Sequence, residues 1–384
     1  MFNRRFAGLI GATAIVFTAC SGGATPSPSA ASVAPASSAP ASVAPASSAP
    51  ASASASAAAT ACKVGVSWNN FQEPRWAKWD EPAIKAAIAA GGGTYDSLDA
   101  KSSATTQASN VETLIANGAK VVIILAQDGT AIKPAVTAAL NAGVPVIAYD
   151  RLIEDPKVLY LTFDNVLVGK LQAQAIFAAA PSGTYAVIKG NKADANADFL
   201  RSGMDQIIKD AVTSGAIKIP SGNEVYTDNW DTKNAQTEME QILTANNNKI
   251  DAVLSENDGM AIGVIAALKA QGLNGKVPVS GQDGDLANLN KVALGEQTVD
   301  VWKDARLLGK TAGDAAIALC ASPDTSKVAG TKPFTTPGKN TINSILLQPD
   351  PITTANLKDV LDAGWIDKAT LCKDVPAGKV PECN

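Results

Sequence analysis

Histidine is absent from this sequence of 384 residues. Because histidine is the commonest general base and the commonest metal ligand, its absence excludes His-dependent catalytic triads and makes an enzyme less expected. Basic residues are not in excess either, with 32 Lys and Arg against 36 Asp and Glu. These charges are interspersed without a basic patch, so nucleic acid is not expected as a partner.

The first twenty residues have the features of an export signal. Arg4 and Arg5 precede a short apolar run from Phe6 to Phe17, and Thr18-Ala19-Cys20 is followed by small residues. The run is too short for a membrane span. Cys20 lies where a bacterial lipoprotein signal places its lipidated cysteine, which predicts a protein exported and anchored to the outer face of the cytoplasmic membrane. The alternative is an ordinary secretory signal with an incidental cysteine.

Residues 21–61 cannot form a core. From Ala24 to Thr60 the sequence is almost entirely Ala, Ser and Pro, and Ser32 to Ala51 is one ten-residue unit written twice. Such a segment lacks the apolar area that would offset its chain entropy. It is therefore expected to be a disordered tether.

Four cysteines remain besides Cys20, and no two of them have the CxxC spacing of a zinc or redox site. An even number in an exported domain suggests two disulfides. A bond between Cys372 and Cys383 would restrain a tail containing Pro and Gly, which leaves Cys62 to pair with Cys320. Free thiols are the alternative, because sequence alone does not determine connectivity.

Eight stretches have the pattern of β-strands, and polar, charged or aromatic residues follow nearly all of them. The expected strands are residues 63–68, 121–125, 144–149, 184–190, 224–229, 250–256, 278–282 and 298–302. The residues beyond their ends include Arg75, Trp76, Asp150, Arg151, Asp194, Asn196, Trp230, Asn257, Asp258, Asp283 and Lys303. Ligands of open α/β sheets lie beyond the carboxyl ends of the strands, so these side chains are expected to meet in one crevice.

Helical patterns alternate with these strands, over residues 74–90, 105–117, 130–142, 166–179, 197–214, 233–245, 260–271 and 305–319. Several end at a glycine, which is a typical helix stop. The strand at residues 121–125 is apolar on both faces, as in a parallel sheet covered by helices on both sides. Residues 62–384 are too many for one typical core. The expected fold is α/β, with two doubly wound parallel-sheet lobes.

Local motifs from Cys62 to about Asp367 resemble the type I periplasmic sugar-binding proteins of ABC importers, and among these the xylose-binding members. The matching segments are residues 148–151, 163–165, 243–253, 257–258 and 280–286. The resemblance implies two lobes joined by three crossing segments, placed here at residues 163–165, 303–304 and 342–347. The implied N-terminal lobe is residues 62–164 plus 304–341, and the C-terminal lobe is residues 165–303 plus 342–384.

The resemblance also implies a set of ligand contacts that nearly coincides with the residues beyond the strand ends. These contacts are Arg75, Trp76, Asp150, Arg151, Asp194, Asn196, Trp230, Asn257, Asp283 and Lys303. Carboxylates, amides and cations suit sugar hydroxyls, which both donate and accept hydrogen bonds, and an indole suits the C–H face of a pyranose. The alternatives are a structural ion-pair network for the charged residues and ordinary core packing for Trp76.

Neither a cofactor nor a metal is expected. Asp194, Asn196 and Asp198 resemble the start of a calcium loop, but Phe199 occupies its glycine position and Asp205 its final glutamate position. The resemblance implies a monomeric receptor that delivers a monosaccharide, with xylose favoured, to an ABC permease. A sensor of the same fold that reports to a membrane kinase or chemoreceptor is the alternative. A sugar enzyme is less expected, because binding already explains the carboxylates.

Overall fold

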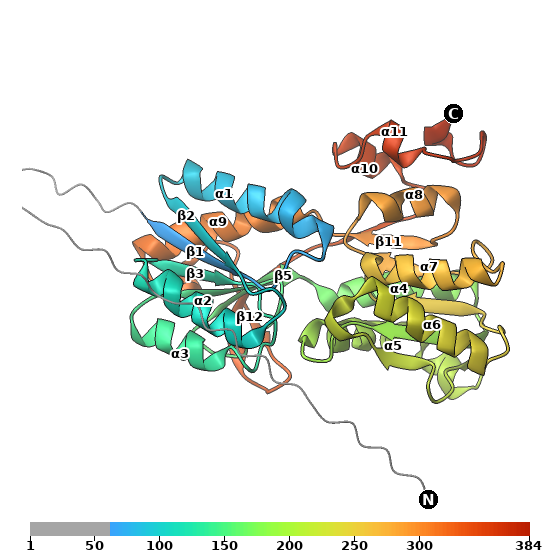
Figure 1. The fold of residues 1–384 in the computed structure, drawn as a ribbon, viewed down its shortest axis with the longest axis horizontal. Helices are drawn as coiled ribbons and strands as arrows, with labels where there is room; N and C mark the ends of the chain where they lie inside the picture. The colour runs from blue at the N-terminus through green and yellow to red at the C-terminus, as the bar shows by residue number, and fades with distance from the viewer. Residues whose placement is uncertain (1–61) are drawn as a thin grey trace, which may run out of the picture. The chain divides into compact units, whose positions relative to one another are not determined.

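The computed structural model describes residues 62–384, and Figure 1 shows how their helices and strands are arranged. The predicted export signal, the lipidation of Cys20 and the tether lie outside the described residues. In the part of the chain that is described, no helix is both long and apolar enough to cross a membrane.

The first lobe is built on a seven-stranded sheet with the strand order β12-β13-β5-β4-β3-β1-β2. Its strands are β1 (Lys63–Trp68), β2 (Thr94–Asp99), β3 (Val121–Ile124), β4 (Val146–Tyr149), β5 (Leu159–Phe163), β12 (Lys332–Thr335) and β13 (Thr341–Leu347). All neighbouring strands are parallel except β12 and β13. Its helices are α1 (Glu81–Ala90), α2 (Ala104–Ala116), α3 (Lys133–Asn141) and α9 (Ala305–Ala321), with the π-helical turn η1 (Trp76–Asp80) before α1 and the 3-10 turn η3 (Thr325–Lys327) after α9.

Both faces of this sheet are covered by helices. Val121 and Ile123 of β3 pack in a cluster with α1 and α9, whereas Val122 and Ile124 pack in a second cluster with α2 and α3. All four side chains are buried, because alternate residues of a strand point to opposite faces. The prediction of a strand apolar on both faces is confirmed.

The second lobe contains two sets of strands. In the first set, β6 (Gly183–Lys189) is parallel to β7 (Ile217–Lys218), β8 (Glu224–Tyr226) and β9 (Ala252–Ser255). The second set is β10 (Ser280–Gln282), β11 (Val299–Trp302) and the antiparallel β14 (Asp350–Ile352). A bridge between Val253 and Val279 connects the two sets.

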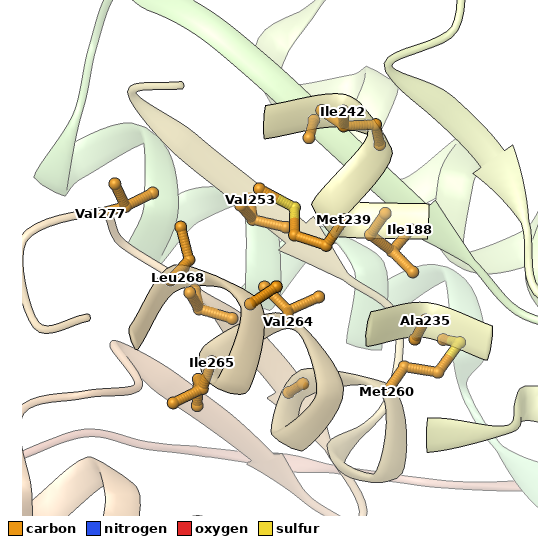
Figure 2. Packing of buried hydrophobic residues seen from close by; sticks show 14 of the residues in the cluster. Ile188, Ala235, Met239, Ile242, Val253, Met260, Val264, Ile265, Leu268 and Val277 are labelled. Atoms are coloured by element: carbon orange, nitrogen blue, oxygen red, sulfur yellow. The ribbon is translucent and has the colours of Figure 1, made fainter. Parts of the chain in front are cut away.

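The helices of the second lobe are α4 (Asn165–Ala179), α5 (Ala195–Thr213), α6 (Thr232–Ala245), α7 (Asp258–Ala270), α8 (Leu286–Leu294), α10 (Lys358–Asp362) and α11 (Lys368–Leu371), with the 3-10 turns η2 (Asp228–Trp230) and η4 (Pro381–Cys383). Figure 2 shows α6 and α7 packed on the sheet through Met239, Val264 and Val253. Burying each side chain of this size contributes about 1.5–3 kcal/mol. The helices therefore hold the strand ends in place.

The chain passes between the lobes at three places. It crosses at Asp164, between β5 and α4, and at Lys303–Asp304, between β11 and α9. Asp164 and Asp304 each cap the helix that follows, by accepting a backbone hydrogen bond from Leu167 and Arg306, respectively. The resemblance implied crossings at residues 163–165 and 303–304.

The third crossing differs from the prediction, which placed it at residues 342–347 and assigned those residues to the second lobe. Residues 341–347 form β13, which pairs in register with β5 and β12 inside the first lobe. The chain leaves that sheet only after Leu347 and enters β14 at Asp350. Backbone pairing on both sides of β13 is the physical reason for the correction.

Two disulfides restrain the described chain, in the pairing expected from the sequence. Cys62, at the start of β1, is bonded to Cys320 in α9. Cys372, which ends α11, is bonded to Cys383 in η4. The second bond closes the C-terminal tail, whose buried Leu371 and Val380 pack in one cluster with Leu289 of α8.

Candidate functional site

A cavity lies where the carboxyl ends of the strands of both lobes meet. Its empty volume is about 280 Å³. It is lined by Glu73, Trp76, Asp150, Arg151, Asp194, Asn196, Trp230, Asn257, Gln282, Asp283 and Lys303. Of the side chains expected to meet in one crevice, all except Arg75 and Asp258 are in this lining. Segments far apart in the sequence therefore converge on one cavity, as the strand pattern predicted.

Helix starts and left-handed backbone turns place these side chains. Asp194 and Asn257 cap the N-termini of α5 and α7. Asp150 (φ 61°) and Asp283 (φ 105°) follow the ends of β4 and β10, and Trp230 (φ 58°) ends η2. A positive φ is costly for residues other than glycine and persists where the surroundings hold it, often at functional sites.

Arg75 lies behind the cavity rather than on its wall. Its guanidinium forms a bidentate pair with Asp80, with Nη2 to Oδ1 at 2.9 Å and Nε to Oδ2 at 3.1 Å. Nη1 donates to Oδ1 of Asp283 at 2.9 Å, and the guanidinium carbon lies 4.4 Å from the ring centre of Trp76. Asp80, Asp283 and Trp76 contact this group directly, and the expected ligand contact of Arg75 stays a prediction.

Several polar contacts join the two lobes around the cavity. Arg75 and Asp283 come from different lobes, and so do Arg151 and Asp194, whose Nε and Oδ2 are 3.0 Å apart. Asn196 Nδ2 also donates to the backbone oxygen of Asp150 at 3.0 Å. These contacts require the lobes to be close together, so the structure represents a closed cleft.

The buried charges have shifted pKa values. Burial would raise the pKa of Asp283, but Lys303 at 3.0 Å and Arg75 outweigh burial, so this pKa is lowered. Burial raises the pKa of Asp80 to about 6, although Arg75 opposes the rise. Burial, with Asp283 and Asp285 nearby, raises the pKa of Glu73 to about 8. The network therefore keeps Asp283 ionised and favours the protonated form of Glu73 at neutral pH.

Four polar atoms around the cavity are buried without a hydrogen-bond partner. They are Nε1 of Trp76, Oδ1 of Asp150, Nε1 of Trp230 and Oε1 of Gln282. The Asp150 oxygen has only ion-pair contacts, to Arg75 at 3.5 Å and Lys303 at 3.8 Å. Leaving a buried polar group unpaired costs about 1–3 kcal/mol. Two donors and two acceptors without partners around one cavity indicate a ligand that both accepts and donates hydrogen bonds.

The two indoles of the cavity are both buried but differ in their surroundings. Trp76 packs beside Trp68, with ring centres 6.3 Å apart, and so has the core contacts that the alternative interpretation expected. Trp230 lies over Gly190, where an added Cβ would be 2.1 Å from the ring atom Cη2. Only glycine leaves room for this ring.

Two lining residues were missed by the sequence analysis. Glu73 lies two residues before Arg75, and the sequence analysis named only Arg75 and Trp76 in this segment. Gln282 is the last residue of β10 and lies inside a matching motif, but only residues beyond the strand ends were considered. The signal for Gln282 was therefore present in the motif itself.

No cluster of three or more metal-ligating side chains occurs within residues 62–384. Asp198, considered above as part of a calcium loop, instead accepts hydrogen bonds from Lys189 at 2.8 Å and Tyr226 at 2.6 Å.

Comparisons with known proteins agree with this geometry. The family model described as a periplasmic binding protein domain matches residues 64–323. The D-xylose-binding periplasmic protein of Escherichia coli (strain K12) is 37% identical over 308 residues, which cover 79% of this chain and 90% of that protein. The multiple sugar-binding periplasmic receptor ChvE of Rhizobium radiobacter is 34% identical over 334 residues, covering 82% and 94% of the two chains.

A solved structure provides the same comparison in three dimensions. A carbohydrate transporter solute binding protein from Chloroflexus aurantiacus, in complex with D-glucose, aligns with a TM-score of 0.74 at 30% identity, covering 82% of this chain and 98% of that chain. These relatives are binding proteins and not enzymes. The chain belongs to the periplasmic binding protein family and is a solute-binding protein with the type I fold, similar to the D-xylose-binding proteins.

Proposed function

We propose that this protein captures a monosaccharide, D-xylose or a closely related aldose, between its lobes and delivers it to an ABC permease. The observation that supports this most strongly is the set of cavity atoms without a hydrogen-bond partner: the Trp76 and Trp230 donors and the Asp150 and Gln282 acceptors. A neutral sugar satisfies such a set, because each hydroxyl both donates and accepts. Indole rings and C–H faces of a pyranose also pack well together.

The proposal of a monosaccharide also rests on the relatives. The Escherichia coli relative is a D-xylose-binding protein, and the Chloroflexus structure is a complex with D-glucose. A five- or six-carbon aldose is therefore the favoured ligand class.

We further propose that ligand binding closes the lobes by rotation at the crossing segments, which are Asp164, Lys303–Asp304 and residues 348–349. The lobe boundaries then follow the sheets, with residues 62–163 and 305–347 in the first lobe. Closure brings Arg75 to Asp283 and Arg151 to Asp194, so ligand and ion pairs stabilise the same closed state. Hinges of this kind are short element-terminal segments.

For its location, we propose that the chain is exported, lipidated at Cys20 and held at the membrane by the tether of residues 21–61. This rests on the sequence pattern of the N-terminal segment. A receptor anchored in this way would stay within reach of its permease.

A thermal-shift panel of D-xylose, D-glucose, D-ribose, L-arabinose and myo-inositol tests the proposed function. A ligand at a hundred times its Kd stabilises the folded state by about 2.7 kcal/mol, which is a readily measured rise in Tm. We expect D-xylose or another aldose to raise the Tm and myo-inositol to have a smaller effect. A panel in which no monosaccharide raises the Tm at millimolar concentration would contradict the proposal.

A further inference from the structure

A larger outer groove adjoins the inner cavity at the mouth of the cleft. It offers more space than the inner cavity. The first lobe contributes the segment from Gln72 to Trp79, and the second lobe contributes the starts of α6, α7 and α8. Space for a second ring therefore lies directly outside the space for the first.

Glu73 and Trp230 line both spaces, so they form the boundary between them. Glu73 comes from the first lobe and is only 8% exposed. Its Oε2 lies 3.2 Å from where a Cβ would stand on Gly259, near the start of α7 in the second lobe. The carboxyl group of Glu73 therefore extends across the cleft to the opposite lobe.

The charges around Glu73 allow its carboxyl group to stay in this position. Burial favours the protonated form of Glu73 and so raises its pKa, as do the charges of Asp283 and Asp285, whereas Arg151 and Arg75 oppose the rise. A neutral carboxyl group can lie against another lobe at a lower desolvation cost than a charged one. The Glu73 side chain can therefore keep this position when the lobes are closed.

The outer groove has the mixed character of a carbohydrate or aglycone subsite. The ring of Trp79 and the side chains of Ile262 and Leu286 provide apolar surface, while Lys78 and Asp231 provide polar groups. An aromatic ring with polar groups beside it suits a pyranose or an aryl substituent. The groove would accept such a substituent if the way from the inner cavity were open.

We propose that Glu73 is a specificity-determining residue, which closes the inner cavity toward the outer groove and so restricts the ligand to free monosaccharides. This inference rests on the proposed function, because it assumes that a sugar occupies the inner cavity. A glycoside or disaccharide would place its second group where the Glu73 side chain lies. Exclusion by such a clash is a usual source of specificity.

Calorimetric titration with D-xylose and xylobiose tests this proposal. Xylobiose offers one ring substituted at O1 and one substituted at O4, so it probes the groove whichever end of the sugar faces it. The readout is the ratio of the two affinities. We expect the wild type to prefer D-xylose strongly, and Glu73→Ala to shift the ratio toward xylobiose by about tenfold or more.

Three further variants test whether the ratio of affinities shifts because the volume of the Glu73 side chain is lost or because its charge is lost. Glu73→Gln has nearly the same volume and should keep the wild-type ratio, whereas Glu73→Ser should shift the ratio as Glu73→Ala does. Ala287 is exposed on α8 and lines the groove but not the inner cavity. In the double variant Glu73→Ala/Ala287→Trp, the new indole should fill the groove and reverse the shift.

The outcomes separate the two proposals. A wild type that binds D-xylose, with no shift in either Glu73→Ala or Glu73→Ser, overturns the role of Glu73 and leaves the proposed function standing. A wild type that binds xylobiose as tightly as D-xylose also overturns it. A wild type that binds no monosaccharide overturns the proposed function and the inference with it.

Discussion

Replacing Asp283 by Asn tests whether the ion-pair network serves binding or only stability. The Asp283 carboxylate lies 2.9 Å from Arg75 Nη1 and 3.0 Å from Lys303 Nζ, and both cations are almost fully buried. Asparagine keeps the shape of the side chain but removes the negative charge. The two cations then keep their contacts to Asp150, at 3.5 Å and 3.8 Å, and Arg75 keeps Asp80.

The expected loss follows from the strength of charged hydrogen bonds. A hydrogen bond to a charged group contributes about 1.5–3 kcal/mol, and each 1.4 kcal/mol is a factor of ten in affinity. If Asp283 accepts from a sugar hydroxyl in the closed state, Asp283→Asn should weaken D-xylose binding by roughly tenfold to a hundredfold. In an open, unliganded cleft water replaces the lost contacts, so the Tm without sugar should change by only a few degrees.

The assay is calorimetric titration with D-xylose, together with the Tm of the unliganded protein. Asp314→Asn is a matched control, since Asp314 is an exposed carboxylate paired only with Lys310 on the same helix. Such pairs contribute little, so this variant should bind D-xylose as the wild type does. Near-normal affinity in Asp283→Asn, with a clearly lowered Tm, would refute the binding role and support a structural network.

Three further predictions concern the ring, the proton and the anchor. Gly190→Ala should weaken D-xylose binding about tenfold in calorimetry, because its Cβ would displace the Trp230 ring; unchanged affinity would show that this ring does not contact the sugar. The pKa of Glu73 is about 8 in the closed structure against an ordinary 4.5, so closing a hydrated cleft should take up a proton. The contribution of Glu73 to D-xylose affinity should therefore fall as the pH rises from about 5 to 8. Titrations in buffers of different ionisation enthalpy should detect this uptake in the wild type and less of it in Glu73→Gln; equal uptake in both would assign the proton to another group. Cys20→Ala should move the protein from the membrane to the soluble fraction or leave its signal uncleaved, and a fully soluble wild type would disprove the anchor.

The strands and helices of the second lobe were largely predictable, because apolar strands alternate with amphipathic helices there. Four strands of the first lobe, β2, β5, β12 and β13, were not predicted. β2 is an edge strand whose residues, Thr-Tyr-Asp-Ser-Leu-Asp, are only partly buried, so it lacks an apolar pattern. β5 is fully buried, but it has only five residues and ends directly at a crossing segment, so its apolar run is short. The pairing of β13 between β5 and β12 is a long-range contact that no local pattern reveals.

The site residues were predictable to the extent that they follow strand ends. Asp150, Trp230 and Asp283 all have left-handed backbone conformations beyond the strands, and sequence reasoning found each of them. Whether a side chain faces the cavity or lies behind it depends on its partners. Arg75 is bonded to Asp80 and Asp283, and the Glu73 carboxyl group lies beside Gly259 of the opposite lobe. These are properties of packing rather than of local sequence.

Calorimetric titration of the purified wild type with D-xylose tests the central claim most directly. The claim is that the cavity bounded by Trp76, Asp150, Trp230 and Gln282 holds one monosaccharide. The account predicts saturable binding of one D-xylose or closely related aldose per chain, with a negative heat-capacity change as the cleft closes over the sugar. A folded protein that shows no saturable heat with any aldose of five or six carbons would contradict it.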